Sequence, residues 1–272
     1  MNMTQSELEL EQLRQARDLL ENPGLAARIS DLVGTPIERG FELLPERWSQ
    51  VVNAATRKAI ESTLDIALGT MNADRRGTPS NWWHKAAATA TGATGGAFGL
   101  GALAVELPIS TGIMLRSIAD IARSEGEDLA GSEARVQCLQ VLALGGRSRG
   151  DDAAETGYFA ARAAMARAVS EAASHLARKG LAEKSAPAIV RLVSVVASRF
   201  SIVVSEKAAA QAVPLVGAFG GAAINAVFID HFQDMARGHF IVRRLERSHG
   251  TEAVRRMYAE LAGEESGQRR LP

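Results

Sequence analysis

The sequence predicts an all-α fold, a single compact multi-helix domain built around two Gly/Ala-rich apolar helices. Apolar residues recur at spacings of three and four along most of the 272-residue chain, which is the period of an amphipathic helix. Gly and Pro repeatedly stand where these patterns start and stop, as helix boundaries require. Two stretches, 86–105 and 213–225, are rich in Gly and Ala, and between residues 86 and 115 the one charged side chain is Glu106. So many small residues allow helix backbones to approach closely.

Local signals place the other helices. A first helix follows Thr4 or Ser6, with Glu7 or Glu9 three residues later as in a capping box. We expect further helices at 25–33, after Pro36, at 48–69, from Ser132 to Gly145, through the stripe of Tyr158, Met165, Val169 and Leu176, and from Pro187 onward. The run 189–204 is apolar nearly all round, which indicates a buried helix. Polar loops are expected at 72–80 and 147–152.

Charge and cysteine content narrow the function classes. Lys plus Arg equals Asp plus Glu at 31 each, so no overall field attracts nucleic acid or an anionic membrane. The single cysteine, Cys138, excludes an internal disulfide and a cysteine-based zinc cluster, and we expect it in the core of a protein from a reducing compartment. The first twenty residues are acidic and amphipathic, unlike a secretory signal. We therefore expect a cytoplasmic protein with no nucleic-acid partner.

The two Gly/Ala-rich stretches share a spacing that favours helix pairing. Glycines four residues apart remove side chains from one helix face, so that another helix can pack closely there. The first stretch has the length of a bilayer span of about 20 residues, but it has few of the large side chains that drive insertion. We expect the two stretches to pack together at the centre of the fold. The glycines are Gly92, Gly95, Gly96 and Gly99 in the first stretch and Gly217 and Gly221 in the second.

Glu106 stands where the first stretch meets Pro108. Proline at a first helical position starts a helix, and a carboxylate just before it suits the positive end of the helix dipole. We therefore expect one helix to end near Glu106 and another to begin at Pro108, with Ile109 facing inward. Helix capping is the simplest role for Glu106 in this arrangement.

Asp230, His231 and Asp234 are the other candidate site residues. They lie within little more than one helical turn, so carboxylates and an imidazole can share a face as metal ligands or an acid/base pair do. Three ligands on two turns are short of a closed metal site. Salt bridges to Arg116, Arg237 or Arg243 also account for the carboxylates.

Three motifs in this order resemble the EcsC protein family. They are Asn22-Pro-Gly24 through Gly34-Thr-Pro36, then Glu106-Leu-Pro108 to Leu115-Arg116-Ser-Ile118 with its Gly-rich approach, and then the segment Val213–Glu246. The resemblance covers about Gly24 to Gly250. It implies a protein related to one encoded beside an ABC transporter, in a family with no settled biochemical activity. The motif positions, none with an established role, are Glu106, Pro108, Arg116, Asn225, Asp230, His231, Arg237, His239 and Phe240.

The expected organisation has three parts. Residues 1–22 form a mobile N-terminal helix, 23–250 an EcsC-like helical domain, and 251–272 a short helix with a disordered tail. The tail from Gly263 is polar and charged, which is typical of disorder.

Two functional hypotheses follow. The first is a non-enzymatic accessory on the inner face of the cytoplasmic membrane, linked to transport or envelope processes, with a membrane surface, a membrane transport protein or a second copy of the chain as partner and with no cofactor. The second is an acid/base or metal-dependent hydrolase, with a site between Glu106 and the Asp230/His231/Asp234 cluster. We expect no hydrolase motif of the G-x-S-x-G or H-E-x-x-H kind and no phosphate-binding loop, which favours the first hypothesis.

Overall fold

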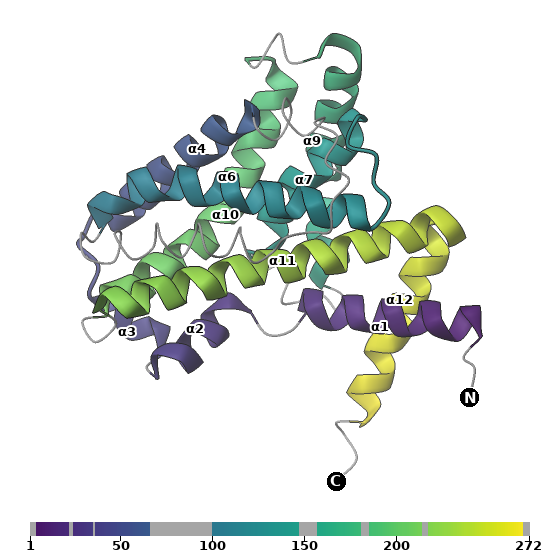
Figure 1. The fold of residues 1–272 in the computed structure, drawn as a ribbon, viewed down its shortest axis with the longest axis horizontal. Helices are drawn as coiled ribbons and strands as arrows, with labels where there is room; N and C mark the ends of the chain where they lie inside the picture. Colours follow the sequence, from purple (N-terminus) through teal and green to yellow (C-terminus); the bar gives the residue numbers. More distant parts are fainter. Residues whose placement is uncertain are drawn as a thin grey trace.

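The computed structural model describes residues 4–21, 24–34, 36–65, 100–146, 157–180, 185–213 and 217–268. Within these ranges it contains helices and no strand, which confirms the all-α prediction. Ten helices pack into one compact domain (Figure 1). They are α1 (Gln5–Glu21), α2 (Leu25–Val33), α3 (Ile37–Glu42), α4 (Trp48–Asp65), α6 (Leu100–Ser124), α7 (Ser132–Leu144), α9 (Gly157–Lys179), α10 (Pro187–Ala212), α11 (Gly217–His249) and α12 (Thr251–Gln268).

α10 is the central helix of the domain. It contacts α2, α3, α4, α7, α9 and α11. The burial expected for 189–204 is only partial, because 39% of the apolar window of α10 is buried and Val190 is 43% exposed. Its Phe200 ring packs against Phe228 and Phe232 of α11, at centroid distances of 6.1 and 5.4 Å. Among the described helices, α10 is the one long and apolar enough to cross a membrane. A core helix can have the same composition, and α10 packs against six other described helices.

α11 runs the length of the domain beside α6, and α1 lies along its later part (Figure 1). α1 buries Leu13, Ala16 and Leu20. Gly238 of α11 permits this contact, because a Cβ there would lie 2.6 Å from Leu20 Cγ and 2.8 Å from the Ala16 carbonyl oxygen. The mobility expected for residues 1–22 stays a prediction, whereas the docking surface of α1 is well defined.

Several local signals have the expected structure. Thr4 and Glu7 form the capping box: the Thr4 backbone N–H donates to the Glu7 carboxylate at 2.7 Å, and the Glu7 N–H donates to Thr4 Oγ1 at 3.3 Å. Gly34 ends α2 with φ at 66°, a left-handed conformation that favours glycine. Pro187 occupies the first turn of α10. The expected apolar stripe of α9 is buried.

The boundary expected at Pro108 is wrong. α6 continues from Leu100 to Ser124 with Pro108 inside it. Proline lacks the N–H that would bond to the carbonyl of residue 104, but the flanking turns stay helical because α6 packs against α4, α7 and α11. Ile109 was expected to face inward and is 48% exposed instead. Glu106 consequently lies within a helix, so the helix-cap role expected for it is wrong too.

Other boundaries also differ. Gly131 precedes α7 as its N-cap, and the Ser132 hydroxyl donates to the Ala173 carbonyl of α9 rather than capping its own helix. α12 extends to Gln268, so part of the tail expected to lack structure is helical.

The expected pairing of the two Gly-rich stretches falls mostly outside the described residues. Gly92, Gly95, Gly96 and Gly99 are not among them, so this pairing stays a prediction. Gly221 is buried on α11. Among the described residues, close backbone contacts occur at glycines that the sequence did not single out. A Cβ at Gly40 would lie 2.2 Å from the Ala209 carbonyl oxygen, and one at Gly146 would lie 2.3 Å from that of Arg199.

Candidate functional site

Glu106 forms a buried ion pair with a residue of the central helix. Lys207 Nζ of α10 donates to Glu106 Oε1 at 2.6 Å and to Asn225 Oδ1 of α11 at 2.8 Å. The same nitrogen lies 4.8 Å from the centroid of the Phe228 ring. The Lys207 ammonium group has three N–H bonds, and it makes two hydrogen bonds and one cation–π contact. We call Glu106, Lys207 and Asn225 the lysine cluster.

The lysine cluster is closed to solvent. The side chains of Lys207 and Glu106 are 0% and 4% exposed. Burial lowers the pKa of the Lys207 amine, while the charge and hydrogen bond of Glu106 oppose this effect. The pairing is what lets a charged amine remain in the core, because an isolated buried ammonium would be strongly unfavourable.

Asp230, His231 and Asp234 lie on α11, one or more turns beyond Asn225. The hydrogen bonds described for His231 and Asp234 are not with the lysine cluster. Asp234 accepts hydrogen bonds from Arg28 of α2 and from Arg237, both at 3.0 Å. His231 Nε2 donates to the Gly145 carbonyl at the end of α7, also at 3.0 Å. Asp234 is therefore in salt bridges, as the simpler interpretation of the sequence holds. The described residues contain no group of three His, Cys, Asp or Glu side chains arranged to hold a metal ion.

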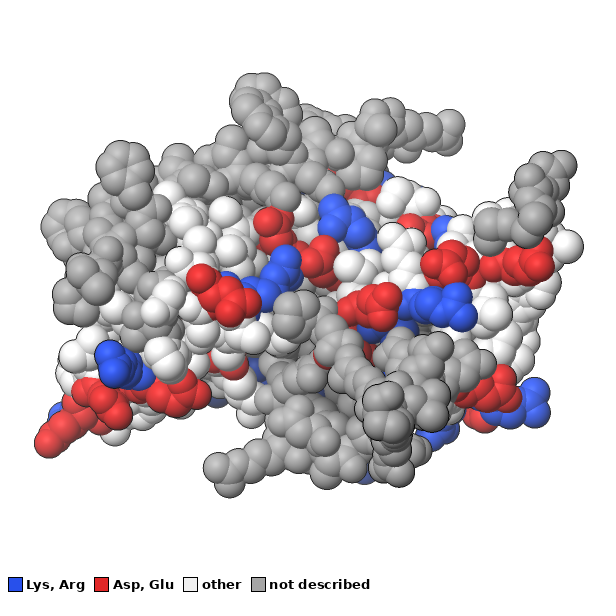
Figure 2. Space-filling model, turned by 90° about the horizontal axis from the view of Figure 1, so that it is seen from below, with Lys and Arg blue, Asp and Glu red and all other residues white. Residues whose placement is uncertain are grey.

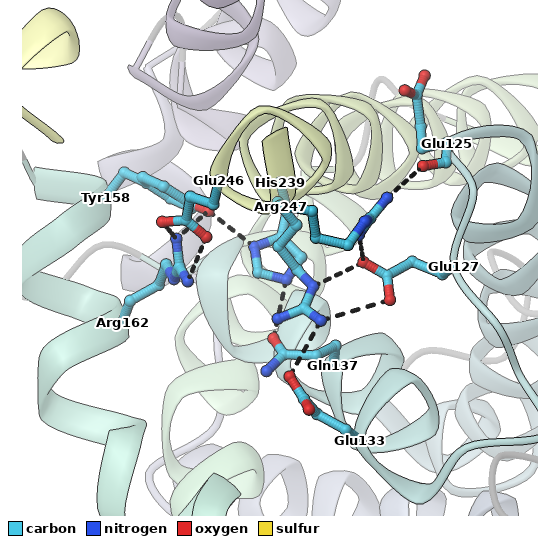
Figure 3. Close-up of polar contacts among 10 residues, drawn as sticks. Glu125, Glu127, Glu133, Gln137, Tyr158, Arg162, His239, Glu246 and Arg247 are labelled. Atoms are coloured by element: carbon cyan, nitrogen blue, oxygen red, sulfur yellow. Dashed lines mark hydrogen bonds and ion pairs between the residues drawn. The ribbon is translucent and has the colours of Figure 1, made fainter. Parts of the chain in front are cut away.

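His239 is the centre of a second polar cluster (Figure 3). Its Nδ1 lies 2.9 Å from Tyr158 Oη, and its Nε2 lies 3.0 Å from Gln137 Oε1. Because Oε1 only accepts, Nε2 carries the proton and Nδ1 accepts from the tyrosine hydroxyl. Arg162 donates to Tyr158 Oη at 3.2 Å and pairs with Glu246 through two hydrogen bonds of 2.8 and 3.0 Å. We call these five residues the histidine cluster.

The histidine cluster is neutral inside and charged at its edge. Burial, assisted by the charges of Arg162 and Arg243, lowers the pKa of His239 well below its usual value, so the imidazole stays neutral. Burial raises the pKa of the Tyr158 hydroxyl. The Arg162 and Glu246 side chains are 19% and 9% exposed and close the cluster on its outer side. His239 itself is fully buried, so it presents no atom to a substrate in this structure.

The basic end of α11 is paired with acidic residues that follow α6. Arg243 bonds to Glu127 at 2.8 Å and to Glu133 at 3.1 Å, and Arg244 bonds to Glu125 at 2.5 Å. Arg247 also pairs with Glu127 (Figure 3). Charges of both signs are interspersed over the face in Figure 2. The basic end of α11 is therefore largely neutralised by neighbouring carboxylates.

A cavity of about 620 Å³ lies between α9 and the start of α10. Its lining includes His175. His175 is partly buried, and its Nε2 is buried without a hydrogen-bond partner. Glu171, also in the lining, is held by Arg167 at 2.8 Å and by Arg191 at 2.6 Å.

One cysteine and one serine motif contain residue types that can act as nucleophiles. Cys138 is buried, as expected, and burial raises the pKa of its thiol to about 12, so it is not a reactive thiolate. Gly146-Arg-Ser148-Arg-Gly150 matches the G-x-S-x-G pattern of hydrolases, so the expectation that this pattern is absent is wrong. That motif works at a turn between a strand and a helix. Here Gly146 follows α7, and Ser148 is outside the described residues, so the match supports no nucleophile.

Lys207 is the main site residue that sequence reasoning missed. One signal pointed to it: a lysine stands at the end of a long apolar run and is flanked by three alanines. Tyr158 was assigned only to an apolar stripe, and Gln137 was not considered. Two of the family-motif positions, Asn225 and His239, lie in the two buried clusters. Arg237 pairs with Asp234. Arg116 is exposed, and Phe240 is in the core.

The fold and the clusters define a single-domain all-α protein with a paired lysine and a neutral histidine in its core. The chain belongs to the EcsC protein family, whose model matches residues 7–245. The match confirms the resemblance seen in the sequence and begins earlier, within α1. Comparison with curated proteins and with solved structures gave no match.

Proposed function

We propose that this EcsC family protein is a non-enzymatic helical accessory that works at the inner surface of the cytoplasmic membrane, in transport or envelope processes. The observation that carries the proposal is an outward apolar stripe on the first half of α6. Val105 is 68% exposed and Ile109 is 48% exposed, with Pro108 and Ile113 partly buried beside them. Exposed apolar side chains that cluster on one helix are typical of an interaction surface.

The surroundings of the stripe favour a bilayer as its partner. The uncharged segment 86–99 leads directly into α6, so the sequence before the stripe is also apolar or small. Val51, on the adjacent helix α4, is 38% exposed. Arg116 is exposed two turns after Ile109, where a cation suits the headgroup level. The chain carries no net charge, so burial of apolar area rather than attraction to anionic lipid supplies the affinity.

Vesicle flotation tests this proposal. The wild-type protein is expected to float with phosphatidylcholine vesicles, and adding anionic lipid should change binding little. The double variant Val105→Ser/Ile109→Ser should bind at least about tenfold more weakly, because two apolar side chains no longer enter the bilayer. Val190→Ser is the matched control, since Val190 is 43% exposed but lies at the start of α10. Wild-type protein that stays wholly in the soluble fraction would contradict the proposal.

A further inference from the structure

Pro108 makes a weak point in α6. Proline has no N–H, so residue 108 donates no helical hydrogen bond to the carbonyl of residue 104. The pyrrolidine ring also crowds that carbonyl. The Ser110 hydroxyl donates to the Leu107 carbonyl at 3.2 Å, a local bond that competes with the helical pattern in the same turn. Helix bending concentrates at such positions. Residues 100–107 of α6 therefore precede a position at which the helix can bend more easily than elsewhere.

The described side chains of this segment are those of Leu103, Val105, Glu106 and Leu107, and α6 also packs against α4. Leu103 and Leu107 are buried, and Val105 points outward into solvent. Glu106 provides the polar attachment, through Lys207 of α10. Lys207 in turn bonds to Asn225 of α11, so one ammonium group ties three helices together.

We propose that the lysine cluster is a latch: it holds residues 100–107 of α6 against α10 and α11, Pro108 is the hinge, and opening of the latch presents the apolar segment to the bilayer. The part concerning the bilayer rests on the function proposed above. The motion of the segment does not.

The free energy of the buried ion pair links the lysine cluster to the position of this segment. In the closed form, Glu106 and Lys207 are out of water and depend on each other, so removing one charge leaves the other buried and unpaired. In an open form water hydrates both groups, and the same substitution has little effect there. A weakened pair therefore shifts the population toward the open form. If the bilayer binds the open form, its apparent affinity rises in proportion to the open fraction.

Hydrogen exchange on Glu106→Gln tests the motion directly. Amides of residues 100–107 are expected to exchange at least tenfold faster than in the wild type, while those of α7 and of residues 112–124 change much less. Vesicle affinity should rise by at least threefold. Unchanged exchange in 100–107, or equal acceleration along the whole chain, would overturn the latch. Unchanged or weaker vesicle binding by the folded variant, when the wild type binds, would overturn its link to the membrane.

Pro108→Ala tests the hinge if Glu106→Gln does not fold. Alanine restores the missing N–H and has the highest helix propensity, so exchange in 100–107 should slow by at least threefold and vesicle binding should weaken. Faster exchange in this variant would overturn the hinge. If the two variants change the exchange as expected but no form of the protein binds vesicles, the latch stands and the proposed function fails.

Discussion

The two buried clusters differ in where their charged side chains lie. The lysine cluster places a charged amine and a carboxylate together in the core, with side-chain exposures of 0% and 4%. The histidine cluster keeps neutral groups inside and leaves its charges, on Arg162 and Glu246, at an edge that is 19% and 9% exposed. Each cluster joins three helices: α6, α10 and α11 in one, and α7, α9 and α11 in the other.

The difference predicts how each cluster responds to damage. A buried ion pair leaves an uncompensated charge when one partner is removed. A chain of neutral hydrogen bonds leaves only an unsatisfied dipole, and a charged residue at the edge can turn toward water. Loss of one charged residue of the lysine cluster should therefore lower the free energy of unfolding strongly. Loss of one hydrogen-bonding group of the histidine cluster should lower it less.

The largest expected effect is that of Lys207→Met. It leaves Glu106 charged in the core and should lower the free energy of unfolding by about 3–5 kcal/mol, as measured by urea denaturation. The double variant Glu106→Leu/Lys207→Met removes both charges and should recover most of that loss. Arg57→Met, which breaks the exposed Arg57–Glu61 pair, is the surface control and should change stability by less than about 0.5 kcal/mol. If Lys207→Met lowers the free energy of unfolding by less than about 1 kcal/mol, the predicted difference in sensitivity between the two clusters is wrong.

The next effect concerns Glu206, the neighbour of Lys207 on α10. Burial raises the pKa of its carboxyl from 4.5 to about 7. The folded state therefore binds a proton more tightly than the unfolded state, and this contribution to stability is present below pH 4.5 and is lost as pH rises through 7. Between these pH values it should fall by about 2–3 kcal/mol. Urea denaturation at pH 5 and pH 7.5 should show a smaller decline in Glu206→Gln than in the wild type. Equal declines would refute the assignment.

The smallest expected effect is that of Tyr158→Phe in the histidine cluster. It removes the hydroxyl that donates to His239 Nδ1 and should lower the free energy of unfolding by about 1–2 kcal/mol. Tyr258→Phe is a useful comparison, because the Tyr258 hydroxyl donates to Glu21, which also accepts from the Tyr158 N–H. A loss for Tyr158→Phe as large as that for Lys207→Met would show that the neutral cluster is as sensitive as the charged one.

Local signals explain what the sequence predicted well. The Thr4–Glu7 box, the left-handed Gly34, the Pro187 start and the α9 stripe each depend on neighbours within a turn or two of helix. The predictions that are wrong depend on contacts between helices that are far apart in the sequence. Packing carries α6 through Pro108, and the partner of Glu106 lies 101 residues away on another helix. A single charged residue in an apolar run does not indicate which other helix it will face, so the sequence paired Glu106 with the wrong residues.

The contact of α1 with α11 has a consequence for how the chain is made. The surfaces that α1 covers, on α11 and α12, are synthesised about 200 residues later, or roughly 10–40 s at ribosomal rates. During that interval Leu13, Ala16 and Leu20 have no site on which to dock. α1 is therefore synthesised well before the helices that it packs against, and it can reach its final place in the fold only after α11 is complete.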